Sequence, residues 1–79
     1  MADLPGMDLK QKVGVRIRQL RKELGLSQEA LALKADVDRT YVTDVEAGRR
    51  NVSLEILERL IKALDVSVAD FFYSKEFKK

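Results

Sequence analysis

The sequence predicts a single all-α domain of five helices, and two observations indicate this class. Apolar residues recur every three to four positions in five successive segments, which is the spacing of amphipathic helices. No segment alternates apolar and polar residues as a half-buried strand would, and no internal repeat is present. With 79 residues, 46% of them apolar, the chain can form one hydrophobic core but not two.

The first helix is expected to begin after Asp8, a residue type that caps helix N-termini, and to end before Gly25. Its inner stripe repeats at helical spacing and consists of Leu9, Val13, Ile17, Leu20 and Leu24. Residues 1–7 show no periodicity and contain the only proline, so we expect a flexible N-terminal arm. Met7 is an alternative natural start.

Two short amphipathic segments follow, Gln28 to Ala35 and Arg39 to Glu46, separated by three residues. Ser27 and Asp38 are the expected N-caps, with the Asp38 carboxylate accepting from backbone N–H groups, and Asp36 suits a left-handed turn. Helices joined so closely must cross steeply. The inward positions are Leu31, Ala32, Ala35, Val37, Val42 and Val45. This pattern is typical of a helix-turn-helix, whose second helix enters the DNA major groove; an ordinary helical hairpin is the alternative.

The last third of the chain contains a leucine-rich helix after Ser53 and a short helix from Val68 to Tyr73 after Ser67. The leucine-rich helix has a wider apolar face than a solvated helix needs, which indicates a second partner. We expect a dimer interface formed by Ile61, Leu64, Val68 and Phe72. The domain would therefore span residues 8–73, and residues 74–79 would form a charged, mobile C-terminal tail.

Charge is distributed unevenly, although the net charge is only +2. Residues 9–22 include six basic side chains and no acidic one, and Arg39, Arg49 and Arg50 add a second basic cluster. Acidic residues gather in the last third of the chain. One side of the molecule should therefore be positive and attract phosphate.

The chain contains no cysteine and no histidine, which removes disulfides, thiol-ligated zinc and the usual nucleophiles and general bases. We therefore expect no enzyme activity, no catalytic residue, no metal, no cofactor and no small-molecule ligand. No apolar run is long enough to cross a membrane, and no signal peptide is evident. A cytoplasmic location without membrane contact is expected.

The segments SQEALA, the valine turn and the helix ending VEAGRR, followed by a leucine-rich helix, resemble the XRE family of Cro-like and lambda-repressor-like helix-turn-helix proteins. The resemblance covers about residues 9–72 and implies a five-helix lambda-repressor-like DNA-binding domain. Within the family, DRTYVTDVEAGRRN is most similar to the controller proteins of restriction-modification systems. Those proteins are small homodimers without a ligand-sensing domain.

The resemblance also implies roles for individual residues. The base edges would be read by Arg39, Thr40 and Thr43, and the DNA backbone would be held by Gln28, Tyr41, Arg49, Arg50, Asn51 and Arg18. Gln28 would also brace the first residue of the second motif helix, and Glu46 would pair with a basic residue of the same domain. Asp44 stands where the family often has serine or glycine. We expect Asp44 to accept from a cytosine amino group or an arginine, or to face away from DNA.

These residues predict a sequence-specific transcriptional regulator that binds double-stranded DNA as a homodimer on a palindromic operator, with residues 39–46 in the major groove. The two half-sites would lie one helical turn apart, about 34 Å. The alternative is an antitoxin-like or other protein-interaction module in which DNA binding is secondary. Antitoxins usually carry a longer toxin-binding segment than the residues that follow Tyr73.

Overall fold

A computed structural model describes residues 8–78, and every regular element in that range is helical, as predicted. The elements are α1 (Leu9–Glu23), α2 (Gln28–Ala35), α3 (Arg39–Glu46), α4 (Leu54–Ala63), α5 (Val68–Phe72) and a short 3-10 helix, η1 (Lys75–Phe77). The predicted arm at residues 1–7 lies outside the described residues, as does the alternative start at Met7. Within residues 8–78, no helix has the length and apolar character that crossing a bilayer requires.

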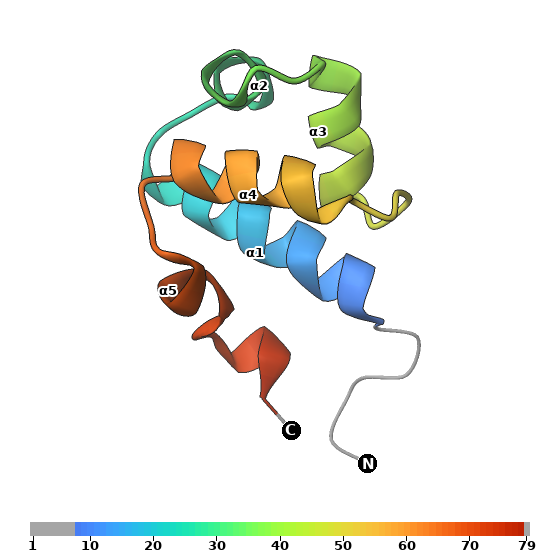
Figure 1. The fold of residues 1–79 in the computed structure, drawn as a ribbon, viewed down its shortest axis with the longest axis vertical. Helices are drawn as coiled ribbons and strands as arrows, with labels where there is room; N and C mark the ends of the chain where they lie inside the picture. Colours follow the sequence, from blue (N-terminus) through green and yellow to red (C-terminus); the bar gives the residue numbers. More distant parts are fainter. Residues whose placement is uncertain (1–7, 79) are drawn as a thin grey trace.

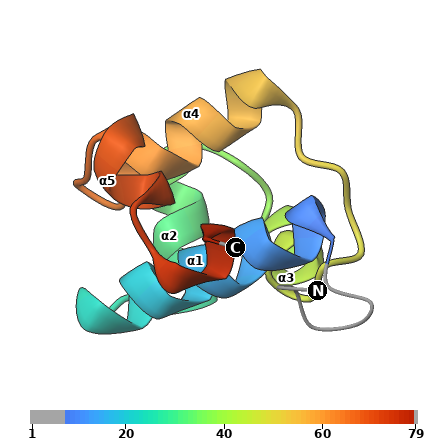
Figure 2. The same ribbon diagram turned by 90° about the horizontal axis from the view of Figure 1, so that it is seen from below.

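The helices pack in two layers around one core. Figures 1 and 2 show α1 and α4 lying across from each other, with α2 and α3 at one end of the molecule and α5 with η1 at the other. The fully buried side chains come from all five α-helices: Phe71, Ile17, Leu31, Leu60, Leu64, Val42 and Val45. The outer ends of the predicted α1 stripe depart from this pattern, because Leu9 and Leu24 are exposed.

Side-chain caps fix most helix starts. Asp8 accepts from the Gln11 backbone N–H while the Gln11 side chain accepts from the Asp8 N–H, which completes a capping box. Hydrogen bonds from Lys10 and from the Gln11 N–H lower the pKa of the Asp8 carboxyl. The prediction for Asp38 is wrong in one respect: its backbone is extended like an N-cap, but its carboxylate accepts no backbone N–H. The Asp38 side chain is exposed, so water can satisfy it.

The C-terminal residues fold back instead of forming the predicted mobile tail, at least as far as residue 78. Phe77 of η1 packs against the core, with its ring centroid 4.9 Å from that of Phe72 and 6.2 Å from that of Phe71. Arg16 of α1 holds the neighbouring helix: its Nε lies 2.7 Å from Phe71 O and its Nη2 lies 2.8 Å from Asp70 O. Burial of the aromatic side chains is the physical reason for this order.

Two of the four predicted interface residues are core residues. Ile61 is 3% exposed and Leu64 is 1% exposed within a single protomer, because α5 packs against α4 and Phe71 joins the same buried cluster. The buried part of the apolar face of α4 is therefore packed within the protomer, against α2 and α5. Val68 and Phe72 remain 55% and 37% exposed.

Candidate nucleic-acid interface

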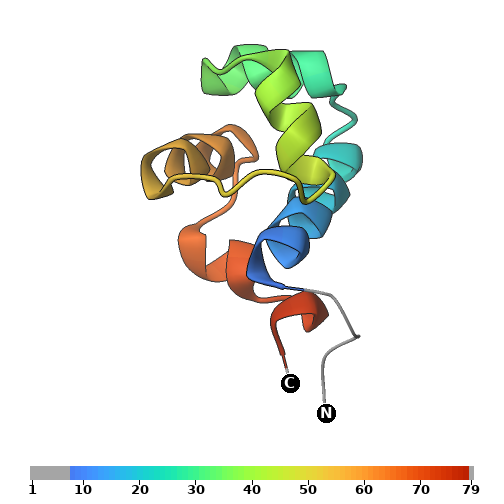
Figure 3. The same ribbon diagram turned by 90° about the vertical axis from the view of Figure 1, so that its right-hand side faces the viewer.

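The second and third helices meet at a steep angle, which is visible where α3 faces the viewer (Figure 3). Asp36 ends α2 in the left-handed conformation, with φ 59° and ψ 49°, as its position in the sequence predicts. The next N–H, that of Val37, donates to Ala32 O at 2.9 Å. Arg59 of α4 donates to the carbonyl oxygens of Ala35 and Asp36, so the turn is also fixed from outside.

The third helix lies unusually close to α1, and Gly14 makes this possible. A Cβ atom at Gly14 would lie 2.3 Å from Val45 O and 2.9 Å from Glu46 O, both on the α3 backbone. Sequence reasoning missed this residue. The available signal was a glycine in the middle of a predicted helix, where it is unfavourable unless close packing requires it.

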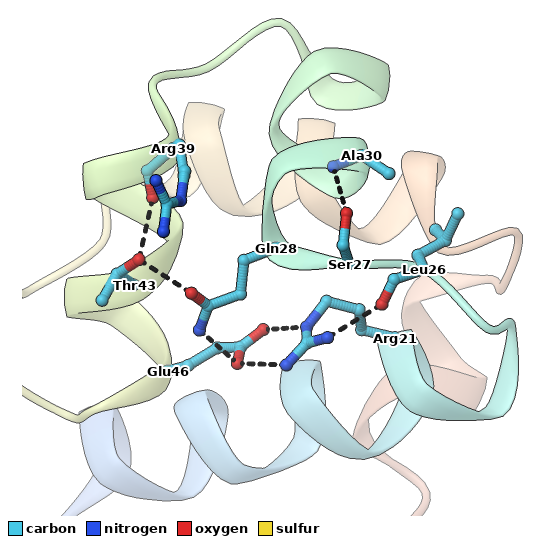
Figure 4. A network of polar contacts seen from close by, with 8 residues as sticks. All are labelled: Arg21, Leu26, Ser27, Gln28, Ala30, Arg39, Thr43 and Glu46. Atoms are coloured by element: carbon cyan, nitrogen blue, oxygen red, sulfur yellow. Dashed lines mark hydrogen bonds and ion pairs between the residues drawn. The ribbon is translucent and has the colours of Figure 1, made fainter.

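A buried ion pair joins α3 to α1. Arg21 donates to both oxygens of Glu46, from Nε at 2.7 Å and from Nη2 at 2.9 Å (Figure 4). The two side chains are only 11% and 4% exposed. The Glu46 carboxylate raises the pKa of the Arg21 guanidinium by accepting these bonds. The remaining Arg21 nitrogen donates to Leu26 O at 2.8 Å, so each of the three guanidinium nitrogens has a hydrogen-bond partner. The basic partner that the resemblance implied for Glu46 is therefore Arg21.

Gln28 extends this network to α2. Its Nε2 donates to Glu46 Oε1 at 3.1 Å, and its Oε1 accepts from the Thr43 hydroxyl at 2.9 Å (Figure 4). The Thr43 hydroxyl also lies 3.2 Å from Arg39 O. Gln28 thus braces the middle and end of α3, and reaches the first turn only through Thr43. This corrects the expectation of direct contact with Arg39.

The outer face of α3 carries the side chains predicted to read bases. Arg39 and Thr40 are exposed, and Thr43 is half-buried one turn after Arg39. Val42 and Val45 occupy the opposite face and are buried. The network behind α3 fixes its orientation, so its exposed side chains have a defined position relative to the rest of the domain.

The predicted backbone-contact residues surround this face. Arg49, Arg50 and Asn51 lie in the exposed loop that follows α3, and the Arg50 guanidinium lies 4.4 Å above the Tyr41 ring. Arg18 is exposed on α1, one turn from both Gly14 and Arg21, which pack against α3. The structure therefore groups the predicted backbone-contact residues around the α2–α3 pair.

An apolar groove lies on a different part of the surface, between α4 and α5. It has a volume of about 360 Å³ and is lined by Leu54, Glu55, Leu57, Glu58, Ile61, Val68 and Phe72. Leu54 belongs to the wide apolar face predicted for this helix but not to the four predicted interface residues, and it is 84% exposed. Among residues 8–78, no group of three or more histidine, cysteine, aspartate or glutamate side chains is placed to hold a metal ion.

A steeply crossed helix pair, braced from behind, with exposed arginine and threonine side chains on the outer face of its second helix and further arginines in the loop after it, defines the class of helix-turn-helix DNA-binding domains. Comparison with known families agrees, since the helix-turn-helix family model matches residues 17–71. The chain belongs to this XRE-type helix-turn-helix family.

Its relatives include controller proteins of restriction-modification systems, which confirms the resemblance found in the sequence. Control protein C.MunI of a Mycoplasma species is 42% identical over 66 residues, which cover 82% of this chain and 89% of that protein. Control protein C.BamHI of Bacillus amyloliquefaciens is 47% identical over 58 residues, which cover 72% of each chain. The controller protein C.Esp1396I, solved as a tetramer on its natural 35 base-pair operator, superposes with a TM-score of 0.85 at 39% identity, covering 92% of this chain and 99% of that one.

Proposed function

We propose that this protein is a sequence-specific transcriptional regulator that binds a palindromic DNA operator as a homodimer, with α3 in the major groove. The observation that carries the proposal is the exposed face of α3, held in place by the Arg21–Glu46–Gln28 network. The structure of C.Esp1396I on its operator supports DNA binding by this type of chain. The sequence lacks histidine and cysteine, and the proposal includes no catalysis and no cofactor. It places the protein in the cytoplasm.

Binding would combine a sequence-blind and a sequence-reading contribution. Arg18, Arg49 and Arg50 would contact phosphate, which gives affinity that falls as salt rises. Arg39 would read a base edge, and its guanidinium fork suits the O6 and N7 acceptors of guanine. A good bidentate contact of this kind contributes about 1 to 3 kcal/mol of discrimination.

One short helix reads too few base pairs to locate a single site in a genome, so a dimer is part of the proposal. The groove between α4 and α5 offers the apolar surface for a twofold contact, because Leu54, Val68 and Phe72 remain exposed beside it. A dimer formed there would present two copies of α3 to successive major grooves on one side of the DNA.

The Arg39→Ala variant tests the reading role. Its affinity is measured on a duplex selected from a random pool and on a random duplex, with Lys62→Ala as a control that removes an exposed cation from α4. We expect Arg39→Ala to lose about 10- to 100-fold on the selected duplex, the loss of one bidentate base contact, and far less on the random duplex. Equal losses on both duplexes would contradict the assigned role. A wild-type protein with no preferred duplex would favour the protein-interaction alternative.

A further inference from the structure

Asp44 places a negative charge on the surface that the proposed function turns toward DNA. It follows Thr40 by one helical turn, so the two side chains share a face of α3. Its side chain is 27% exposed. Phosphate repels a carboxylate, so an acidic residue at this position weakens binding unless it finds a donor in the complex.

The carboxylate is occupied by the loop arginines in the unbound protein. Asp44 Oδ1 lies 3.0 Å from Arg49 Nη2, and Oδ2 lies 3.7 Å from Arg50 Nη2. Both arginine side chains are well exposed, at 64% and 44%. Exposed ion pairs of this kind contribute little to stability, so DNA can exchange them for other partners.

The loop itself does not depend on the carboxylate. The Arg49 backbone N–H donates to Asp44 O at 3.0 Å, and the Arg50 guanidinium also rests on the Tyr41 ring. A substitution at Asp44 that keeps the helix therefore leaves the loop in place. It changes only which partners the two guanidinium groups find.

We propose that Asp44 is a specificity-determining residue that changes partner on binding. In the operator complex its carboxylate accepts a hydrogen bond from the exposed amino group of a cytosine in the major groove, which releases Arg49 and Arg50 to phosphate. On other DNA the carboxylate finds no such donor and keeps competing with phosphate for the two arginines, so their phosphate contacts are weaker there than on the operator. The inference rests on the proposed function and adds one base of specificity to it.

The test compares base preferences after selection from a randomised duplex pool. The wild-type half-site should have a cytosine fixed at one position. With Asp44→Ala that position should accept any base while the remaining positions are unchanged. Asp44→Asn should move the preference toward adenine, because a neutral amide can both donate and accept along that base edge. Unchanged preferences in both variants would overturn the inference.

A second measurement tests the release of the arginines and uses random duplex only. Asp44→Ala should bind random DNA more tightly than wild type, with a steeper salt dependence. If the variant makes one more phosphate contact, its gain in affinity over wild type should be about three- to fourfold larger near 50 mM than near 200 mM salt. Asp65→Asn is the charge-matched control, because it also removes one negative charge from an ion pair. Asp65 pairs with Lys34 just beyond the C-terminal end of α4. Weaker random binding by Asp44→Ala, or an equal gain by Asp65→Asn, would overturn the inference.

Different outcomes would overturn the proposed function and the role of Asp44. A wild-type protein that enriches no sequence would overturn the proposed function, whatever the variants do. A wild-type protein that enriches a palindrome, together with an Asp44→Ala variant that behaves identically, would overturn only the role of Asp44. Thermal unfolding of each variant confirms that equal amounts of folded protein are compared.

Discussion

Glu46 is the residue at which three helices meet, because it belongs to α3 and accepts hydrogen bonds from Arg21 of α1 and Gln28 of α2. Its side chain is only 4% exposed. A buried ion pair is tolerated while both charges are present. Removing the carboxylate would leave the Arg21 guanidinium buried without an opposite charge, which is strongly destabilising. One carboxylate therefore joins α3 to both α1 and α2.

We predict that Glu46→Ala lowers the free energy of unfolding by about 3 to 5 kcal/mol, because the Arg21 charge would remain buried without its anion. Urea denaturation followed by circular dichroism measures the change. The control is Lys34→Ala, which breaks an exposed ion pair with Asp65 and should cost less than about 1 kcal/mol. Similar small losses in the two variants would show that the buried pair does not hold α3.

The sequence predicted some of these residues and not others. Asp8, Ser27, Ser53 and Ser67 were identifiable as caps because the residue type and the start of periodicity coincide. The partner of Glu46 was not identifiable, because several basic residues of α1 compete until the rotation of α1 against α3 is known. Asp38 is the N-cap that the sequence predicts, but the expected hydrogen bonds to its carboxylate are absent, since local geometry decides whether a carboxylate turns toward the helix or toward water.

At the scale of elements, the contact between α1 and α3 depends on a missing side chain. Gly14 lets the carbonyl groups of Val45 and Glu46 approach where a Cβ would otherwise lie. Alanine is the better helix former by about 1 kcal/mol, so helix propensity alone predicts that Gly14→Ala stabilises the protein. The clash of an added Cβ with the α3 backbone predicts instead that Gly14→Ala destabilises the protein.

We predict that Gly14→Ala lowers the free energy of unfolding by about 1 to 2 kcal/mol, because a clash with backbone cannot be relieved by a rotamer change and α3 must shift. It should also weaken binding to the selected duplex more than to random DNA. Gly25→Ala is the control. Gly25 has φ 72° and open space around it, so an added Cβ meets no neighbour and the substitution is destabilising only through the left-handed backbone conformation. A stabilised Gly14→Ala protein would contradict the close packing of α1 and α3.

Helix bounds were predictable where periodicity and caps agree, and α2 and α3 begin and end as the sequence indicates. The partners of the helices were harder to predict. The wide apolar face of α4 indicated a second copy, yet α5 covers Ile61 and Leu64 within the protomer. Phe77 was assigned to a mobile tail, because its burial depends on aromatic neighbours that only the folded chain brings together.

In the molecule as a whole, α2 and α3 lie at one end and α5 lies at the other (Figure 1). The apolar groove is lined by residues of α4 and α5 and by none of α2 or α3. This separation would let a protomer bind DNA and a second copy at the same time, as the proposed function requires. A second copy packed on the groove would bury the exposed apolar side chains of Leu54 and Val68, which favours association.

We predict that Leu54→Lys shifts the protein toward monomer while each protomer stays folded, because Leu54 is 84% exposed in the protomer. Sedimentation velocity at micromolar concentration measures the shift. Leu33→Lys is the matched control, since Leu33 is 77% exposed on α2 and is not among the residues that line the groove. Equal sedimentation of both variants and wild type would place the interface elsewhere.

One experiment tests the reading by α3 and the dimer together. The wild-type protein selects bound duplexes from a random pool, and the binding stoichiometry on the selected duplex is then measured. A dimer that reads DNA with α3 should enrich a palindrome whose half-sites lie about 34 Å apart, with two protomers bound to each site. The preference over random DNA should persist as salt is raised. If no sequence is enriched and the weak binding disappears in salt, the arginines around α3 bind DNA without reading it. That result would contradict the assignment as a sequence-specific regulator.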